Sequence, residues 1–498
     1  MDPHGSCLIR RTFIMTMILA VVLPMLAGAL LPLVKPKNRT LKLACITAVL
    51  ALEAVLCLCL ILAPQKDITI WHMTDSLSVR LCSDMLSKLF MALFSFGWLL
   101  VAIFSYVYMR HEHDEDRFYA FYLLSEGALI GMSLAANLVT MYVCFELVTL
   151  FSMPLVLHSM TREAISAALK YLFYSIAGAF MALLGIFFLS YYCGGDFVAG
   201  GNLDVSLLQG KENLLYFVIF LTVVGFGTKA GMYPMHGWLP TAHPVAPAPA
   251  SAVLSALIAK AGVLAIIRVL FYSVGGSFIR GTWVQTTLLC LSLLTVFMGS
   301  MMAFREKVFK KRLAYSTVSQ ISYILTALFL LTEGGFQGAM LHVVFHAVVK
   351  TCLFLTAGAF IFYTGNTRVD EFKGLGKQMP VILWSYTLAS ITLIGIPPTG
   401  GFVSKWYIAS AALDSGLGVF SYLVPIVLLI SALLTAGYLM PISIDAFFPS
   451  KDAAVKAERR ESALMWVPMV ILAGIAVFLG MFCNSLCGFA GTLAQLVL

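Results

Sequence analysis

The sequence contains few charged residues. Asp, Glu, Lys and Arg make up 11% of its 498 residues, whereas 60% are hydrophobic. Soluble domains carry about 25% charged residues, so this composition excludes a soluble globular protein and predicts an integral membrane protein. The net charge of +8 does not suggest a nucleic-acid partner, because much of it lies in short loops between apolar runs.

Motifs that bind metals or cofactors are also missing. The eleven cysteines are scattered through apolar segments, and the closest spacings are Cys57-x-Cys59 and Cys483-x₃-Cys487. These match neither a zinc site nor an iron–sulfur framework, and no glycine-rich nucleotide-binding fingerprint is present. We therefore expect no cofactor, no metal and no redox active site on this chain. If redox chemistry drives the protein, it takes place on another subunit.

Apolar runs of helical length recur nearly from end to end, and each can cross a hydrocarbon core of about 30 Å. The run from Thr12 to Val34 follows Arg10-Arg11 but is long enough to span, so we interpret it as a transmembrane helix and not as a secretory signal. The all-α chain is predicted to have fourteen spans, at 12–34, 41–63, 83–109, 118–136, 137–159, 164–192, 213–233, 249–273, 283–304, 313–332, 336–363, 380–411, 418–447 and 464–490.

Basic residues are distributed unevenly between the two faces that fourteen spans create. Few Lys and Arg residues fall on one face. The loops that fall on the other face are rich in Lys and Arg, at 35–42, 110–117, 305–312, 368–377 and 451–460. Because basic loops stay in the cytoplasm, we predict a multi-pass protein of the cell inner (cytoplasmic) membrane with both termini outside.

Two segments do not have the pattern of a span. Residues 69–79 alternate around Thr74-Asp75-Ser76, which predicts a short extracellular hairpin. Residues 450–462 are charged and are expected on the cytoplasmic surface.

Two lysines lie inside apolar segments, in near-copies of one short phrase. The first copy is Gly225-Phe-Gly-Thr-Lys229 and the second is Gly401-Phe-Val-Ser-Lys405. A lysine at mid-membrane depth costs about 2.5–3.5 kcal/mol on insertion scales, so it rarely remains there without a function. The repetition suggests two related halves, each with a buried ionisable centre, which is typical of a membrane protein that moves protons or ions.

Proline and glycine interrupt the chain beside both lysines. The stretch from Lys229 to Pro240 contains Pro234, and the stretch from Gly395 to Gly401 contains Pro397-Pro398, so neither is one continuous helix. Breaks at membrane depth are tolerated only where protein or a watery cavity satisfies the freed backbone groups. Interrupted segments in corresponding positions of two halves point to a transfer site near the midplane.

Further ionisable residues lie in the middle of predicted spans. Glu146 lies about half-way along its span and would need a cation, for which Lys229 is the natural candidate. Lys260 is far from either end of its span. A static interhelical ion pair is the competing interpretation of Glu146.

A third cluster consists of His342, His346 and Lys350. Their spacing of four places them on one helical stripe about 12 Å long. Histidine donates and accepts protons near neutral pH, so this stripe can pass protons between lysines. The predicted proton relay, called the relay residues below, comprises Glu146, Lys229, Lys260, His342, His346, Lys350 and Lys405.

Other charged residues have plainer interpretations. Arg162, Lys170 and Arg268 are expected to extend their charged ends to the membrane surface. Glu126 is either a second buried carboxylate or a polar residue at a helix end.

Several of these stretches resemble the antiporter-like subunit family shared by respiratory complex I, Mrp-type cation/proton antiporters and membrane-bound hydrogenases or formate hydrogenlyases. The resemblance extends from about Tyr119 to Ile444. Its most specific stretches are Lys229–Gly262 with Trp238-Leu-Pro-Thr-Ala-His243, then His342-x₃-His346-x₃-Lys350, then Gly395-Ile-Pro-Pro-x-Gly-Gly-Phe-x-Ser-Lys405.

The resemblance implies an architecture and roles for the relay residues. It implies fourteen helices with two inverted five-helix repeats at 118–275 and 276–447, after three N-terminal helices and the hairpin (1–117) and before a surface segment and the last helix (448–498). It also implies a Glu146–Lys229 pair, connection through Lys260 and the histidines, and Lys405 as the exit-side centre. Since the chain stops soon after the fourteenth span, we expect no long lateral helix like that of the largest complex I paralogue.

Three functions follow from these residues. The first is a subunit that translocates protons, or possibly Na⁺, in a multisubunit redox-driven complex of the complex I or hydrogenase type. Its partners would be paralogous antiporter-like subunits, other membrane subunits, peripheral redox subunits and lipid. The second is a subunit of a stand-alone Mrp-type cation/proton antiporter. The third is a membrane scaffold whose charges serve assembly alone.

Overall fold

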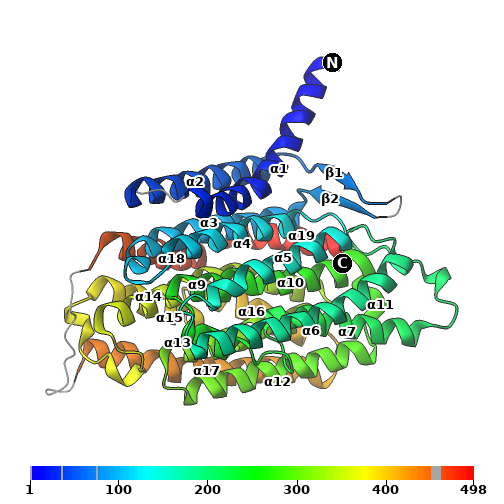
Figure 1. Cartoon of the computed structure of the whole chain (residues 1–498). Coiled ribbons are helices and arrows are strands. Elements are labelled where there is room, and N and C mark those ends of the chain that lie inside the picture. Colours follow the sequence, from blue (N-terminus) through cyan, green and yellow to red (C-terminus); the bar gives the residue numbers. More distant parts are fainter. Residues whose placement is uncertain (1–2, 35–37, 75–76, 450–460) are drawn as a thin grey trace.

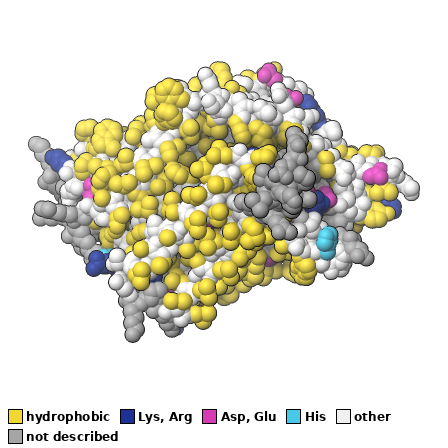
Figure 2. Space-filling view, turned by 90° about the horizontal axis from the view of Figure 1, so that it is seen from above, with side chains coloured by type: hydrophobic (Ala, Val, Ile, Leu, Met, Phe, Trp, Pro, Cys, Tyr) yellow, Lys and Arg dark blue, Asp and Glu magenta, His cyan; other side chains and the backbone are white. Residues whose placement is uncertain are grey.

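The structure is a computed structural model that describes residues 3–34, 38–74, 77–449 and 461–498. Within these ranges, eleven helices are long and apolar enough to cross a membrane, by length and composition. Figure 1 shows helices lying side by side along a common direction, with a two-stranded hairpin at one end. In Figure 2, hydrophobic side chains cover most of the visible face, and charged side chains lie near its two ends.

The N-terminal part contains three long helices and the hairpin. Its elements are α1 (Pro3–Val34), α2 (Arg39–Leu62), β1 (Asp67–His72), β2 (Ser78–Cys82), α3 (Met85–Tyr108) and the 3₁₀ turn η1 (Met109–His111). The strands pair antiparallel, with Asp67 opposite Cys82 and Thr69 opposite Arg80. The predicted hairpin is thus confirmed, and its Arg80 forms ion pairs with Asp67 and with Asp196 of a later loop.

The next part contains a broken helix and a helix with two π-helical segments. Its elements are α4 (Glu115–Leu134), α5 (Leu138–Val156), α6 (Arg162–Cys193), η2 (Val205–Leu207), α7 (Glu212–Ala230), α8 (Leu239–Val245), α9 (Ala248–Val253), η3 (Leu254–Ile258), α10 (Ala259–Ile267), η4 (Arg268–Val274) and α11 (Gly276–Ile279). The residues from Ala248 to Val274 form one apolar candidate span that is buried throughout. This buried span carries Lys260, and we call it the central post below.

The last part repeats the pattern of long helices and one break. Its elements are α12 (Trp283–Arg305), α13 (Phe309–Phe329), α14 (Glu333–Thr364), η5 (Val369–Glu371), η6 (Leu375–Lys377), α15 (Pro380–Ile394), α16 (Gly400–Leu413), α17 (Val419–Phe447), α18 (Ala463–Met481) and α19 (Asn484–Val497). The predicted span 464–490 is wrong at its end. The backbone leaves the helical region at Phe482 (φ −116°, ψ 47°), and α19 begins as a separate helix. Residues 450–460 of the expected surface segment lie outside the described residues.

The sequence predicts that Arg268 extends its charged end to the membrane surface, but the structure shows otherwise. Its side chain is buried and pairs with Asp84, which caps the start of α3, at 2.5 and 2.9 Å, and it also donates to Ser87 at 3.0 Å. A buried guanidinium needs such a partner, because an isolated buried charge is strongly unfavourable. The ion pair therefore ties the central post to the N-terminal helices.

We expect Asp84→Asn to lower the stability of the protein by about 3–5 kcal/mol, since Arg268 would stay buried without its counter-charge. Thermal unfolding of the detergent-purified protein measures this loss. Asp414→Asn is the matched control, because Asp414 is exposed. Equal unfolding temperatures for the two variants would show that the ion pair does not hold these helices together.

Candidate proton-transfer site

Lys229 lies in the last turn of α7, immediately before the first helix break. The chain leaves the helix at Gly231, whose φ of +75° is a left-handed conformation that suits glycine. The Lys229 side chain is 1% exposed. Its Nζ donates to Thr149 Oγ1 at 2.6 Å and to the Tyr171 hydroxyl at 2.9 Å, and it lies 5.2 Å from the centroid of the Phe145 ring. Hydroxyls and an aromatic face therefore hold this ammonium group.

Glu146 lies on α5, the helix that also carries Phe145 and Thr149. It is half-buried, and its Oε1 atom is buried without a hydrogen-bond partner. Among the described residues, no ion pair within 4.0 Å joins Glu146 to Lys229. The pair that the resemblance implies is therefore not closed in this structure, although both side chains belong to one neighbourhood of α5 and α7.

The central post places Lys260 directly against a histidine of α14. Lys260 Nζ lies 2.5 Å from His346 Nδ1, and both side chains are at most 1% exposed. The π-helical segment η3 precedes Lys260, and the Ser255 carbonyl of that segment accepts a second hydrogen bond from Nζ at 3.3 Å. π-helical turns inside α-helices occur frequently at functional sites. Lys260 and His346 form the one direct contact between two relay residues that a hydrogen bond marks among the described residues.

From His346, aromatic and hydroxyl groups continue to the second break. The rings of His346 and His342 are 6.1 Å apart, and Tyr323 stacks on His342 at 5.5 Å. His342 Nδ1 lies 2.9 Å from Ser404 Oγ, and Lys405 Nζ lies 5.1 Å from the Tyr323 ring centroid. The Nε2 atoms of both histidines are buried without a partner among the described residues, so each ring keeps one nitrogen that no described group engages.

Lys405 lies on α16, just after the second break. Its Nζ donates to the carbonyls of Leu393 at 2.6 Å and Ile394 at 2.9 Å, which are free because α15 ends there. Gly395 follows with a φ of +91°. Unlike Lys229, Lys405 is only half-buried. It lines a cavity of about 210 Å³ together with the exposed Trp406.

The two lysines of the repeated phrase are therefore not equivalent in space. Lys229 precedes its break at the end of a helix, whereas Lys405 follows its break near the start of one. The sequence correctly placed a break beside each lysine, and the two lysines lie on opposite sides of their breaks. One lysine is enclosed and the other lies beside a cavity near the molecular surface.

Lys350 shares the stripe of α14 with the two histidines, as its spacing predicts. It is fully buried, and its Nζ donates to the Leu313 carbonyl at 3.1 Å. No described contact joins Lys229 to Lys260. Their helices nevertheless pack closely, because Gly262 lies against the backbone of Phe226 and Ala230.

The structure adds three residues that sequence reasoning did not single out, Thr149, Tyr171 and Tyr323, and gives a partner to Ser404, which the repeated phrase contains. They supply hydroxyls or an aromatic face to Lys229, His342 and Lys405. Hydroxyl residues are common in apolar helices, so only their distance from an ionisable group distinguishes these four from the rest.

Comparison with known proteins identifies the family. Residues 135–435 match the family described as NADH:quinone oxidoreductase/Mrp antiporter, transmembrane. The chain belongs to this family. The match covers more than half of the sequence and includes every relay residue, so the protein is a multi-pass, antiporter-like membrane subunit.

Two relatives illustrate the breadth of the family. NADH-quinone oxidoreductase subunit N of Desulforudis audaxviator is 32% identical over 487 residues, covering 93% of this chain and 95% of the relative. A Na(+)/H(+) antiporter subunit of Alkalihalophilus pseudofirmus is 26% identical over 468 residues, covering 93% of each chain.

Solved structures share the fold. A chain of the membrane-bound sulfane sulfur reductase, an archaeal respiratory membrane complex, superposes with a TM-score of 0.84 at 23% identity, covering 97% of this chain and 99% of that chain. A chain of respiratory complex I from Thermus thermophilus gives 0.81 at 22% identity, with coverages of 97% and 99%. These homologues are subunits of multisubunit membrane complexes. The antiporter-like fold that the sequence predicts is thus confirmed.

Proposed function

We propose that the chain is a proton-translocating subunit of a multisubunit, redox-driven membrane complex, in which the relay residues carry protons. Its fourteen helices would include two inverted five-helix repeats at 118–275 and 276–447, flanked by 1–117 and 448–498. Both termini would lie outside the cell inner membrane. The observation that supports this function best is the buried contact between Lys260 and His346. From His346, neighbouring side chains continue through His342, Ser404 and Tyr323 to Lys405.

The proposed mechanism uses Lys229 as a switch. A negative charge near Lys229 favours its protonated form, whereas a desolvated lysine without a partner loses its proton more readily. In this structure, hydroxyls hold Lys229 and no ion pair connects it to Glu146, so closing that pair would retain the proton and opening it would release the proton. Lys260 and His346 then pass a proton toward His342, and Lys405 delivers it at the side of the molecule.

The coverage of the antiporter relative supports a second candidate. The Na(+)/H(+) antiporter relative aligns with 93% of this chain, the same share as the quinone oxidoreductase relative. A stand-alone Mrp-type cation/proton antiporter would use the same buried groups without a redox partner. Identifying the subunits that co-purify distinguishes the two: small antiporter subunits favour the second, whereas subunits with metal clusters favour the first.

Transport by variants of the two ends of the relay tests whether the charges do more than support assembly. We expect Glu146→Ala and Lys405→Ala each to reduce coupled proton transfer by about 100-fold, the lower end for loss of a positioned proton-transfer group. Dye-monitored acidification of vesicles containing the assembled complex measures this loss. Full transport by both variants would contradict the relay and support the scaffold function.

A further inference from the structure

Outside the relay, one stripe of α4 carries four ionisable residues. Glu115, Tyr119, Tyr122 and Glu126 follow one another at spacings of four, three and four, so they lie on one face of the helix. From Glu115 to Glu126 this face spans about 16 Å. It therefore leads from the end of the helix to about half the thickness of a membrane, and it lies against α2 and α3.

At the deep end, Glu126 meets a second carboxyl group, that of Glu53 on α2. Both side chains are fully buried, and their carboxyl groups are near enough to interact with each other. Cys57 Sγ donates to Glu53 Oε1 at 2.9 Å. Glu53 Oε2 and both oxygens of Glu126 have no donor from any other described residue, and no described cation pairs with either carboxyl group.

Two carboxylates cannot bond to each other, because both are acceptors. Placed together in an apolar site without a cation, they also repel each other. A single proton resolves both problems, since it makes one group a donor to the other. Glu53 and Glu126 are thus placed so that one proton can be shared between an oxygen of each carboxyl group.

Hydroxyl groups lead from this acid pair toward the start of α4. Tyr106 on α3 and Tyr122 both interact electrostatically with Glu126. The Tyr106 hydroxyl lies 2.7 Å from Thr47 Oγ1, and its ring lies 6.1 Å from that of Tyr119. The Tyr119 hydroxyl in turn lies 2.9 Å from Ser105 Oγ.

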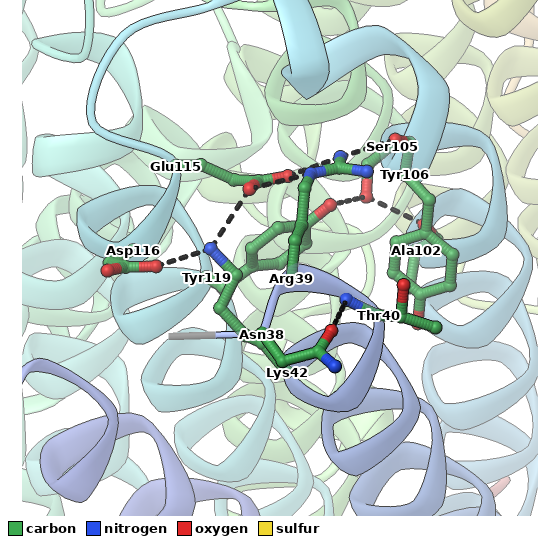
Figure 3. Close-up of polar contacts among 10 residues, drawn as sticks. All are labelled: Asn38, Arg39, Thr40, Lys42, Ala102, Ser105, Tyr106, Glu115, Asp116 and Tyr119. Atoms are coloured by element: carbon green, nitrogen blue, oxygen red, sulfur yellow. Dashed lines mark hydrogen bonds and ion pairs between the residues drawn. The ribbon is translucent and has the colours of Figure 1, made fainter. Parts of the chain in front are cut away.

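These hydroxyl groups and the α4 stripe, together called the column below, end in a network of ion pairs at the start of α2 and α4. Arg39 and Lys42 bind Glu115 at 2.6 and 2.9 Å, and Lys42 also binds Asp116 at 2.5 Å. Figure 3 shows these carboxylates facing the two cations, with Tyr119 and Tyr106 in the same view. Lys42, Glu115 and Asp116 also line an open pocket of about 720 Å³. This end therefore places charged groups beside an open pocket.

We propose that Glu53 and Glu126 form a proton-binding site that is separate from the relay residues. This site exchanges its proton with the aqueous phase along the column. In the exchange, a hydrated proton loses its water and binds one carboxylate oxygen, and the second carboxylate accepts the new hydrogen bond. The Cys57 thiol keeps its own proton and acts as a donor. Both glutamates lie outside the residues that match the family, 135–435.

Infrared spectroscopy of the full chain in lipid nanodiscs tests this site. We expect the wild type at neutral pH to show a C=O stretching band of a protonated carboxylic acid that shifts when H₂O is replaced by D₂O. Glu53→Gln and Glu126→Gln should each shift or remove this band, and the double variant should lose it. A double variant that keeps the wild-type band, or a wild type that lacks the band, would overturn the site.

Two further variants test the route and its independence from the relay. Tyr106→Phe should keep the band but slow its shift in D₂O, whereas Tyr108→Phe, a second buried tyrosine of α3, should leave the rate unchanged. Equal rates for Tyr106→Phe and the wild type would overturn the hydroxyl route. Glu146→Gln should leave the band intact, so failure of the lysine relay and failure of this site are distinguishable.

Discussion

Replacing Lys229 by alanine is expected to lower coupled proton transfer by about 100-fold or more while the protein still assembles. The reason lies in its surroundings. Its ammonium group is enclosed by Thr149, Tyr171 and Phe145 at the end of α7, where no other described amine contacts these groups. Alanine removes the proposed proton carrier, and the neighbouring hydroxyls cannot replace it because they do not hold an exchangeable positive charge near neutral pH.

The measurement is proton transfer by vesicles that contain the purified complex, normalised to the amount of assembled subunit. Lys307→Ala is the matched control, because Lys307 is an exposed lysine of the loop between α12 and α13. The control should pump as the wild type does. Retained pumping by the Lys229 variant would exclude the role of this residue as the switch.

Much of the fold could be predicted from the sequence, because membrane spans depend on local composition. Long apolar runs define the helices, and proline and glycine mark the breaks at Gly231 and Gly395, where the structure shows left-handed backbone. The hairpin was predictable from alternation. The division between α18 and α19 was not, because both helices are apolar and no proline or charge lies at Phe482 to mark their boundary.

Pairings between distant helices were harder to predict. Asp84 and Arg268 are separated by 184 residues, and nothing in the local pattern around Arg268 indicates a buried counter-charge. The hydroxyls that hold Lys229 come from α5 and α6, and their type is too common in membrane helices to stand out. The sequence therefore identified ionisable residues within apolar segments, whereas only packing revealed what each of them touches.

The same limit applies to the repeated phrase, which indicated two ionisable residues but not their surroundings. A lysine in an apolar segment is unusual enough to identify a functional group from one position. Its distance from the break and its exposure depend on the neighbouring helices. Lys229 is closed in by α5 and α6, whereas Lys405 lies beside an open cavity with Trp406. This difference favours an inner switch at Lys229 and a lateral delivery point at Lys405.

The second large effect concerns the contact between Lys260 and His346. We expect Lys260→Met and His346→Gln each to reduce proton transfer by about 100-fold, which corresponds to about 2.7 kcal/mol. If the proton passes directly across the 2.5 Å contact, either change alone interrupts the route. The double variant should then be no slower than the slower single variant, so the coupling between the two changes should be about 2–3 kcal/mol, the upper range for residues in contact.

A double-mutant cycle on rates of proton transfer in vesicles measures this coupling. Lys307→Met combined with His346→Gln provides the comparison, since Lys307 is exposed and is not a relay residue. The coupling in that pair should be smaller than in the pair of Lys260 and His346. If the fold-losses of proton-transfer rate of the two single variants simply multiply in the Lys260 and His346 double variant, the two residues serve separate steps. The side chains from Lys260 to Lys405 would then not form a single proton route.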